Sequence, residues 1–219
     1  MTRLTPHVAR EYWWALLDNA TSLIEDSVRL SDPSPARAQA LLVLAYEELG
    51  KAVWVHDTFQ ESWSAASLEP LVVAELGAAA RHHLAKFLSA HDFAGVLPRP
   101  PIWVAWEELP LAPRNERFDA GTDVRLETQA ILDLTAQRAN DAKQRGFYVD
   151  LLRDGAIRSP RDLEVFDLEV HRGHVAAAIV TLLVVEEFRV KDAREQFEID
   201  RHTSLMARLD LYARDQDYL

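Results

Sequence analysis

Charged side chains interrupt an apolar stretch at residues 45–53, which read AYEELGKAV. On a helix, Lys51 lies about 40° from Glu47 and about 60° from Glu48, so its ammonium group falls between two carboxylates. Apolar residues on both sides predict that this turn lies at least partly inside a helical bundle. Because glycine costs roughly 1 kcal/mol relative to alanine inside a helix, we expect Gly50 to admit another backbone or a ligand.

Two further stretches carry polar side chains that could join this cluster. ARHHLAKFLSAH places His83 and Lys86 three residues apart on one face of a predicted helix. KQRGFYVD, at residues 143–150, places Arg145 in a last helical turn and Tyr148 and Asp150 in an extended segment. Each stretch also has a structural explanation, such as a buried ion pair, a packed histidine or a cation at a helix C-terminus. The residue types alone leave both interpretations open.

The positioning elements are predicted to be helices. The sequence has seven glycines in 219 residues and no sustained period-two alternation with hairpin turns, which predicts an all-α bundle of about five to six helices. Thr5 with Pro6 and Ser34 with Pro35 are typical of helix starts. The predicted helices cover residues 5–31, 34–61, 71–91, 119–145 and 159–191.

The remaining segments are predicted from their composition. Five prolines between residues 96 and 118 predict a long Pro-rich loop over about 92–118, which contains Trp103 and Trp106. Gly146 suits a helix C-terminal cap, and Ser159 with Pro160 suits the start of the fifth helix. We expect residues 1–195 to form the helical domain. Residues 196–219 are expected to form a charged helical extension with one apolar stripe made by Leu205, Met206, Leu209 and Tyr212.

One weak internal repeat is visible. The segments LLVLAYEELGKA (41–52) and VTLLVVEEFRVKDA (180–193) both run from an apolar block into two glutamates and then a lysine. Two helices in similar positions would produce this pattern, and so would chance, because helices often pass from core to solvent in this way.

Composition limits the function classes. The absence of cysteine excludes disulfides and thiolate metal sites and agrees with a reducing compartment. The longest apolar stretch, residues 175–185, is shorter than the roughly 18 residues that span a bilayer, so we expect a cytoplasmic protein without a membrane partner. The net charge of −11 repels nucleic acid at long range, so contact with RNA requires a local basic cleft.

The three polar stretches together resemble a known family. The order of Glu-Glu-x-Gly-Lys at 47–51, His-x-x-Lys at 83–86 and KQRGFYVD at 143–150 resembles the AbiV abortive-infection family of bacterial phage-defence proteins. That family belongs to the HEPN superfamily of helical nucleotide-binding and RNA-cleaving domains. The resemblance spans roughly residues 10–190. It implies a dimeric helical bundle, a toxin that halts growth or translation in an infected cell and so confers phage resistance.

The sequence departs from the superfamily in one respect. HEPN ribonucleases typically carry an arginine and a following histidine with four to six residues between them, and this spacing is absent here. Arg81 and Arg172 are too close to the histidines that follow them, and Arg3 and His7 have only three residues between them. Ribonuclease activity is therefore not simply inherited from the superfamily.

If the three stretches converge, they suit metal-independent RNA cleavage. That reaction needs a base for the 2′-OH, an acid for the leaving 5′-oxygen and cations for the phosphorane. His83 would be the base or acid, because imidazole titrates near neutral pH, and Glu47 or Glu48 would orient it or Lys51. The cations are Lys51, Lys86 and Arg145. Tyr148 would stack or donate a hydrogen bond, and Asp150 completes the predicted set of catalytic residues.

Two alternatives remain. In the first, Glu47, Glu48, His83 and Asp150 hold Mg²⁺ or Mn²⁺, although nearby lysines would compete with the cation. In the second, the protein is a non-catalytic binder of a phage protein or a translation-machinery component, or a plainer regulatory scaffold. We expect no cofactor, a homodimer, RNA or the translation machinery as the target, and a phage protein as a possible activator.

Overall fold

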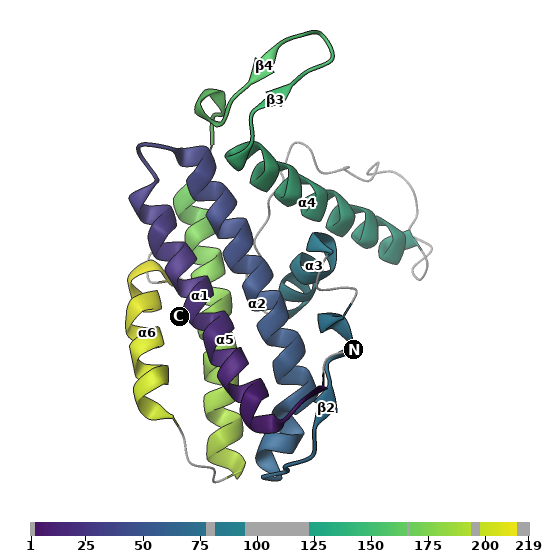
Figure 1. Cartoon of the computed structure of the whole chain (residues 1–219), viewed down its shortest axis with the longest axis vertical. Coiled ribbons are helices and arrows are strands. Elements are labelled where there is room, and N and C mark those ends of the chain that lie inside the picture. The colour runs from purple at the N-terminus through teal and green to yellow at the C-terminus, as the bar shows by residue number, and fades with distance from the viewer. Residues whose placement is uncertain (1–2, 78–81, 95–122, 166, 194–197, 214–219) are drawn as a thin grey trace.

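A computed structural model describes residues 3–77, 82–94, 123–165, 167–193 and 198–213 (Figure 1). These residues form six α-helices: α1 (Pro6–Arg29), α2 (Pro35–Ser64), α3 (His83–Ala94), α4 (Asp123–Phe147), α5 (Leu168–Ala193) and α6 (Ile199–Ala213). Two antiparallel strand pairs are short: β1 (Arg3–Leu4) with β2 (Leu71–Val72), and β3 (Asp150–Leu151) with β4 (Ile157–Arg158). The all-α prediction is confirmed. Most of the predicted Pro-rich loop, including Trp103 and Trp106, lies outside the described residues.

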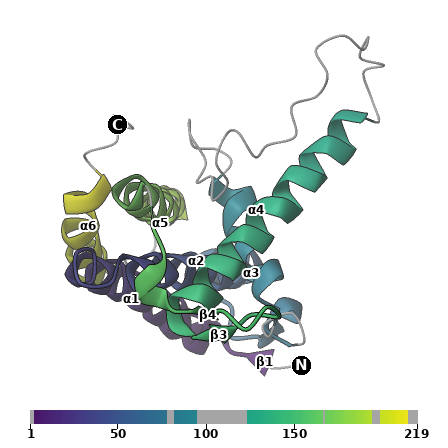
Figure 2. The same ribbon diagram turned by 90° about the horizontal axis from the view of Figure 1, so that it is seen from above.

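Helix α2 is the central element of the fold. It contacts α1, α3, α4 and α5, and α6 packs on α5 and α1 (Figure 1). Helix α4 crosses the end of α2 and points away from the other helices, as the view from above shows (Figure 2). The largest fully buried side chains come from α1, α2, α5 and α6 and include Trp13, Tyr46, Phe59, Ile179 and Leu209. The core therefore lies around α2, and two other helices, α3 and α4, meet its charged turn.

The two predicted helix starts are confirmed. Pro6 and Pro35 are the first residues of α1 and α2. The Thr5 hydroxyl accepts a hydrogen bond from the Val8 backbone N–H at 3.3 Å, which satisfies one of the free amides of the first turn. Ser34 makes no such side-chain bond, so α2 begins on its proline and on packing.

Two predicted starts are wrong. Residues 71–91 do not form one helix, because Leu71–Val72 pair with β1, a short 3₁₀ turn covers Ala74–Leu76, and α3 begins only at His83. Residues 159–191 do not form one helix either. Ser159 and Asp162 exchange side-chain and backbone hydrogen bonds around a 3₁₀ turn, and α5 starts at Leu168. A capping box closes a single turn as well as a long helix, so it marks a start but not a length.

Two glycines allow α2 to be approached closely. A Cβ atom on Gly50 would lie 1.9 Å from the backbone oxygen of Lys86, which confirms that this glycine admits another backbone. A Cβ on Gly146 would lie 2.4 Å from the backbone oxygen of Ala36. Gly146 lies within α4 and not at a cap as predicted, because the helix continues to Phe147. The glycines thus set the distances of α3 and α4 from α2.

Helix α5 is long and apolar enough, by length and composition, to cross a membrane, and it is the one such helix among the described residues. Its buried residues include Ala176, Ile179, Leu182 and Leu183, which are at most 1% exposed in the bundle core. A helix that is packed on several sides needs the same apolar composition.

Helix α6 carries the predicted apolar stripe, which packs against the core. Leu205 and Leu209 are buried, and Met206 and Tyr212 pack against the core that they join. Arg208 of α6 forms ion pairs with two carboxylates of α1, Glu25 at 2.7 Å and Asp18 at 2.6 Å. Whether the chain divides at residue 195 stays a prediction, since α6 shares its core with α1 and α5.

Candidate functional site

Glu47 is the centre of a buried charge cluster between α2, α3 and α4. Its side chain is 3% exposed. One carboxylate oxygen accepts from the Nδ1 of His83 at 2.9 Å and from the Nζ of Lys86 at 2.9 Å, and the other accepts from the Nζ of Lys143. Three residues from two other helices therefore converge on a single carboxylate, which the predicted helix faces alone did not reveal.

The cluster keeps Glu47 ionised. Burial raises the pKa of its carboxyl, but hydrogen bonds from His83, Lys143 and Lys86 outweigh burial, so the pKa lies below its ordinary value. Burial also lowers the pKa of Lys143, against the attraction of Glu47. The lysine side chains are 10% and 6% exposed at positions 86 and 143. Two nearly buried ammonium groups around one carboxylate leave the cluster with positive charge.

His83 is the member of the cluster that reaches solvent. Its side chain is 47% exposed, although its Nδ1 is held by the buried carboxylate. It is also the first residue of α3, where the helix dipole favours a nearby anion. When a carboxylate holds the Nδ1–H of an imidazole, the Nε2 is the nitrogen left to accept or donate a proton. In this arrangement a buried carboxylate orients a solvent-accessible histidine.

Glu48 and Lys51 form a separate pair. The Nζ of Lys51 lies 2.7 Å from one Glu48 oxygen and 2.6 Å from the other. The expectation that Lys51 lies between both glutamates is wrong, because Glu47 faces α3 and α4 and takes its cations from them. The side chains of Lys51 and Glu48 are 17% and 18% exposed, so this pair lies nearer to solvent than Glu47.

Three further residues of the predicted site lie at the end of α4 or after it, and none of them contacts Glu47. Arg145 lies in the last turn of α4, and its side chain makes no hydrogen bond or ion pair in the described part of the chain. Tyr148 is 62% exposed. Asp150 begins β3 and lies opposite Arg158 in the strand register. Whether these residues act in catalysis stays a prediction.

The metal alternative required four ligands to converge. Within the residues that the structure describes, no group of three or more histidine, aspartate or glutamate side chains is placed to hold a metal ion. Glu47 is occupied by lysines, Glu48 pairs with Lys51, and Asp150 lies on the hairpin. The described donors therefore do not form the predicted Mg²⁺ or Mn²⁺ site.

The prediction missed Lys143. This residue opens the stretch KQRGFYVD, and its signal was its place in that stretch, four residues before the end of α4. Gly146 lies three residues further on, and its contact with Ala36 holds this end of α4 against α2.

The comparison with protein families identifies the family of the chain. The model of the AbiV family of HEPN domains matches residues 8–202, which include every member of the Glu47 cluster. The chain belongs to the AbiV family. Its function is therefore of the abortive-infection, HEPN type. No curated protein and no solved structure matches the chain. The match ends inside α6 of this AbiV chain.

This AbiV chain has a second buried charge cluster, centred on Glu186 of α5. The Glu186 side chain is 1% exposed and contacts Arg10, Arg189 at 2.7 Å and His56 at 3.2 Å. Burial raises its pKa, but hydrogen bonds from Arg189 and His56 and the charge of Arg10 lower it to about 2. The Arg10 guanidinium also lies 3.9 Å from the centre of the Trp63 ring.

The two clusters occupy matching places in the internal repeat. Glu47 and Glu186 are each the first glutamate of a pair and are each buried among cations. Glu48 and Glu187 are each the second, and they pair with Lys51 and Lys191 on their own helices. The repeat thus corresponds to two helices that use the same sequence pattern to place a buried carboxylate.

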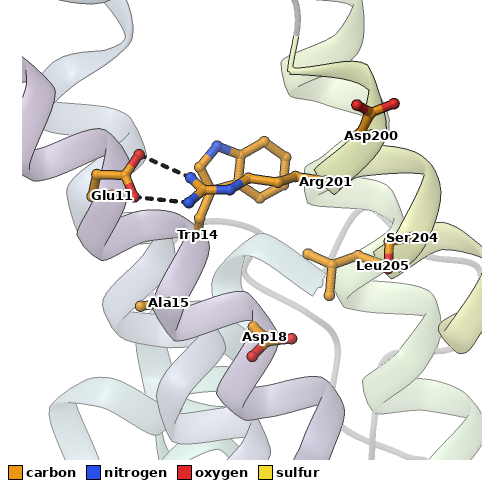
Figure 3. Close-up of a pocket in the computed structure, with 8 residues that line it drawn as sticks. All are labelled: Glu11, Trp14, Ala15, Asp18, Asp200, Arg201, Ser204 and Leu205. Atoms are coloured by element: carbon orange, nitrogen blue, oxygen red, sulfur yellow. Dashed lines mark hydrogen bonds and ion pairs between the residues drawn. The ribbon is translucent and has the colours of Figure 1, made fainter.

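A cavity of about 450 Å³ lies between α1 and α6 (Figure 3). Its lining residues are Glu11, Trp14, Ala15, Asp18, Asp200, Arg201, Ser204 and Leu205. Arg201 crosses to Glu11 with both guanidinium contacts at 2.9 Å, and Asp18 is held by Arg208. The cavity shares no lining residue with the Glu47 cluster, and two of its three carboxylates are already paired. We therefore place the candidate site at His83 and not in this cavity.

Proposed function

We propose that this AbiV-family chain acts in phage defence as an RNA-cleaving toxin, with His83 as its proton-transfer group. The observation that carries the proposal is the contact at 2.9 Å between the buried Glu47 carboxylate and the Nδ1 of a histidine that is 47% exposed. Such a contact fixes the ring and its tautomer, so that Nε2 meets the substrate in a constant orientation.

The proposed reaction requires no group beyond those of the chain and the RNA. The Nε2 of His83 removes the proton of a ribose 2′-OH, and the alkoxide attacks the adjacent phosphorus. The bond to the 5′-oxygen then breaks, which leaves a 2′,3′-cyclic phosphate, and that oxygen takes the proton from the protonated imidazole, so that His83 returns to its starting form. Lys86 and Lys143 supply positive charge beside the developing phosphorane, and the first turn of α3 adds its dipole.

A non-catalytic binding role is the second candidate. The observation that favours it is the burial of Lys86 and Lys143, whose side chains are only 10% and 6% exposed. In that case Glu47 is a structural ion-pair node that fixes the register of three helices, and recognition of a phage or translation partner occurs elsewhere. The homodimer, the cytoplasmic location and the phage activator remain proposals under either function.

Purified protein incubated with total bacterial RNA in EDTA tests the two candidates. We expect discrete cleavage by the wild type and by His82→Ala, and none by His83→Ala. His82 is a matched control because it is the neighbouring exposed histidine and has no role in the cluster. Equal cleavage by both variants would remove His83 from the mechanism. Intact RNA in every lane would favour the binding role.

A further inference from the structure

The β3–β4 hairpin projects beyond the end of the helical bundle (Figure 1). Its turn is closed by hydrogen bonds from the backbone N–H of Leu152 to Ala156 at 2.8 Å and of Gly155 to Leu152 at 2.9 Å. Gly155 has a φ of 84°, which glycine adopts without strain. The backbone N–H of Tyr148 donates to Gln144 of α4 at 3.0 Å, so the base of the hairpin is fixed to that helix.

The hairpin and the end of α4 that leads into it expose aromatic and apolar side chains. Tyr148 is 62% exposed and Phe147 is 40% exposed. Leu151 and Ile157 lie directly opposite each other in the register and are 77% and 70% exposed. Neighbouring exposed apolar side chains of this size are typical of a binding surface and not of a solvated loop.

Arginines without carboxylate partners occur in the hairpin and beside it in the sequence. They are Arg145, Arg153, Arg158 and Arg161, and none of their side chains forms an ion pair with another described residue. The arginines that fasten α5 and α6 differ, since Arg189 and Arg208 are each held by carboxylates. Residues 145–161 contain four arginines and two aspartates, a net charge of +2 in a chain of −11.

Two of the nearby carboxylates are used by the backbone. An Asp154 oxygen accepts from the Ala156 N–H at 3.0 Å, and an Asp162 oxygen accepts from the Ser159 N–H at 3.2 Å. Asp150 lies opposite Arg158 in the strand register. Arg153 and Arg161 are exposed and Arg145 and Arg158 are partly exposed, while Asp154 and Asp162 stabilise the backbone of two turns.

We propose that the β3–β4 hairpin is a binding platform for single-stranded RNA, in which Tyr148 stacks on a base and Arg153 and Arg158 contact phosphates. Exposed aromatic rings in the same short segment as unpaired arginines suit a flexible polyanion with flat bases. The local positive charge also supplies the basic surface that an acidic protein needs in order to bind RNA. This inference rests on the proposed action on RNA.

The platform is adjacent to the candidate site along the chain. Lys143 contacts Glu47, and Phe147 ends the same helix four residues later. RNA bound to the hairpin would therefore lie next to α4, the helix that supplies Lys143 to the Glu47 cluster. Tyr148, predicted to stack or to donate a hydrogen bond, takes the stacking role here.

The test is fluorescence anisotropy with a labelled polyuridine oligonucleotide. The full chain carries His83→Ala in all samples, so that cleavage does not interfere. We expect Tyr148→Ala to bind about tenfold more weakly and Tyr148→Phe to bind as the parent does, because stacking needs the ring and not the hydroxyl. The pair Arg153→Ala and Arg158→Ala should weaken binding and reduce the salt dependence, by about 0.7 in the logarithmic slope per lost phosphate contact.

The matched control replaces two exposed cations away from the hairpin, Arg3 and Lys191, with alanine. Parent-like binding by both hairpin variants would overturn the proposal. So would equal loss in the control, because the effect would then follow net charge alone. Unchanged RNA affinity together with a smaller mass in equilibrium sedimentation would assign the hairpin to contact between two copies of the chain. Because binding is measured without cleavage, an inactive wild type would overturn only the proposed function.

Discussion

At the scale of single residues, the decisive feature is a carboxylate that is buried and ionised. Glu47 accepts hydrogen bonds from two lysines and one histidine on other helices, and Glu186 repeats this arrangement on α5. Neutralising only one partner of such a buried ion pair lowers the stability of the fold, because the other partners then remain buried without a counter-charge.

Glu47→Gln should destabilise the fold by about 3–5 kcal/mol, because two nearly buried lysines lose their carboxylate. Urea unfolding followed by circular dichroism measures the change. Glu48→Gln is the matched control, since its pair with Lys51 lies nearer to solvent and should cost less than about 1 kcal/mol. Equal losses in the two variants would show that Glu47 is not the centre of the cluster.

The stability of the wild type should fall as the pH drops from about 4.5 to about 2. The pKa of Glu186 is lowered from 4.5 to about 2, so its stabilising effect is complete above the unfolded value and is lost as the pH falls through the folded value. Unfolding free energies across this range should depend less on pH in Glu186→Gln. An equally steep dependence in Glu186→Gln, with Glu187→Gln as control, would contradict this assignment.

At the scale of elements, helix α2 receives α3 and α4 at two glycines, and these approaches bring His83, Lys86 and Lys143 to Glu47. The sequence predicted that Gly50 admits a close neighbour. It could not predict that the neighbour is the Lys86 backbone, because helix periodicity defines a face but not the helix that packs on it. Lys143 was missed for this reason.

Local signals predicted where two helices start, but not how long a helical segment continues after such a signal. Pro6 and Pro35 begin α1 and α2, since a proline after Thr or Ser satisfies local rules at a helix start. Ser159 satisfies the same rules but opens only a 3₁₀ turn. The sequence predicted Leu71–Val72 as helix, because no local signal shows that they pair with β1, which lies almost seventy residues earlier in the chain.

Gly50→Ala should destabilise the protein by about 1–3 kcal/mol, although alanine is the better helix former. The added Cβ would lie 1.9 Å from the Lys86 backbone oxygen, so α3 must move away from α2. Thermal unfolding measures the loss. The same variant should lose RNA cleavage at temperatures where it remains folded, because His83 moves with α3. A variant with raised stability would show that α3 does not pack here.

Arg208→Ala should loosen α6 without unfolding the bundle. Arg208 contacts Glu25, Asp18 and Ser22 of α1, and its side chain is 29% exposed, so we expect a cost of about 1 kcal/mol. Hydrogen exchange should become faster in α6 and stay unchanged in α2. Arg201→Ala, which removes a more exposed pair with Glu11, should have a smaller effect. Uniform acceleration across all helices would contradict a local role.

At the scale of the whole molecule, the protein combines an acidic bundle with a local basic hairpin. The net charge of −11 disfavours general binding of nucleic acid, so we expect RNA to reach the chain only at defined places. The AbiV family match covers both the Glu47 cluster and the hairpin. The family resemblance could be recognised from the order of three short stretches, whereas their spatial relation required the fold.

The most direct test is the single-turnover cleavage rate of a defined single-stranded RNA in EDTA, measured for the wild type, His83→Ala and His82→Ala. If Glu47 and His83 form a proton-transfer pair, His83→Ala should be slower by about a hundredfold or more, and His82→Ala should match the wild type. A wild-type rate for a folded His83→Ala protein would contradict the account, and the Glu47 cluster would then be a structural node.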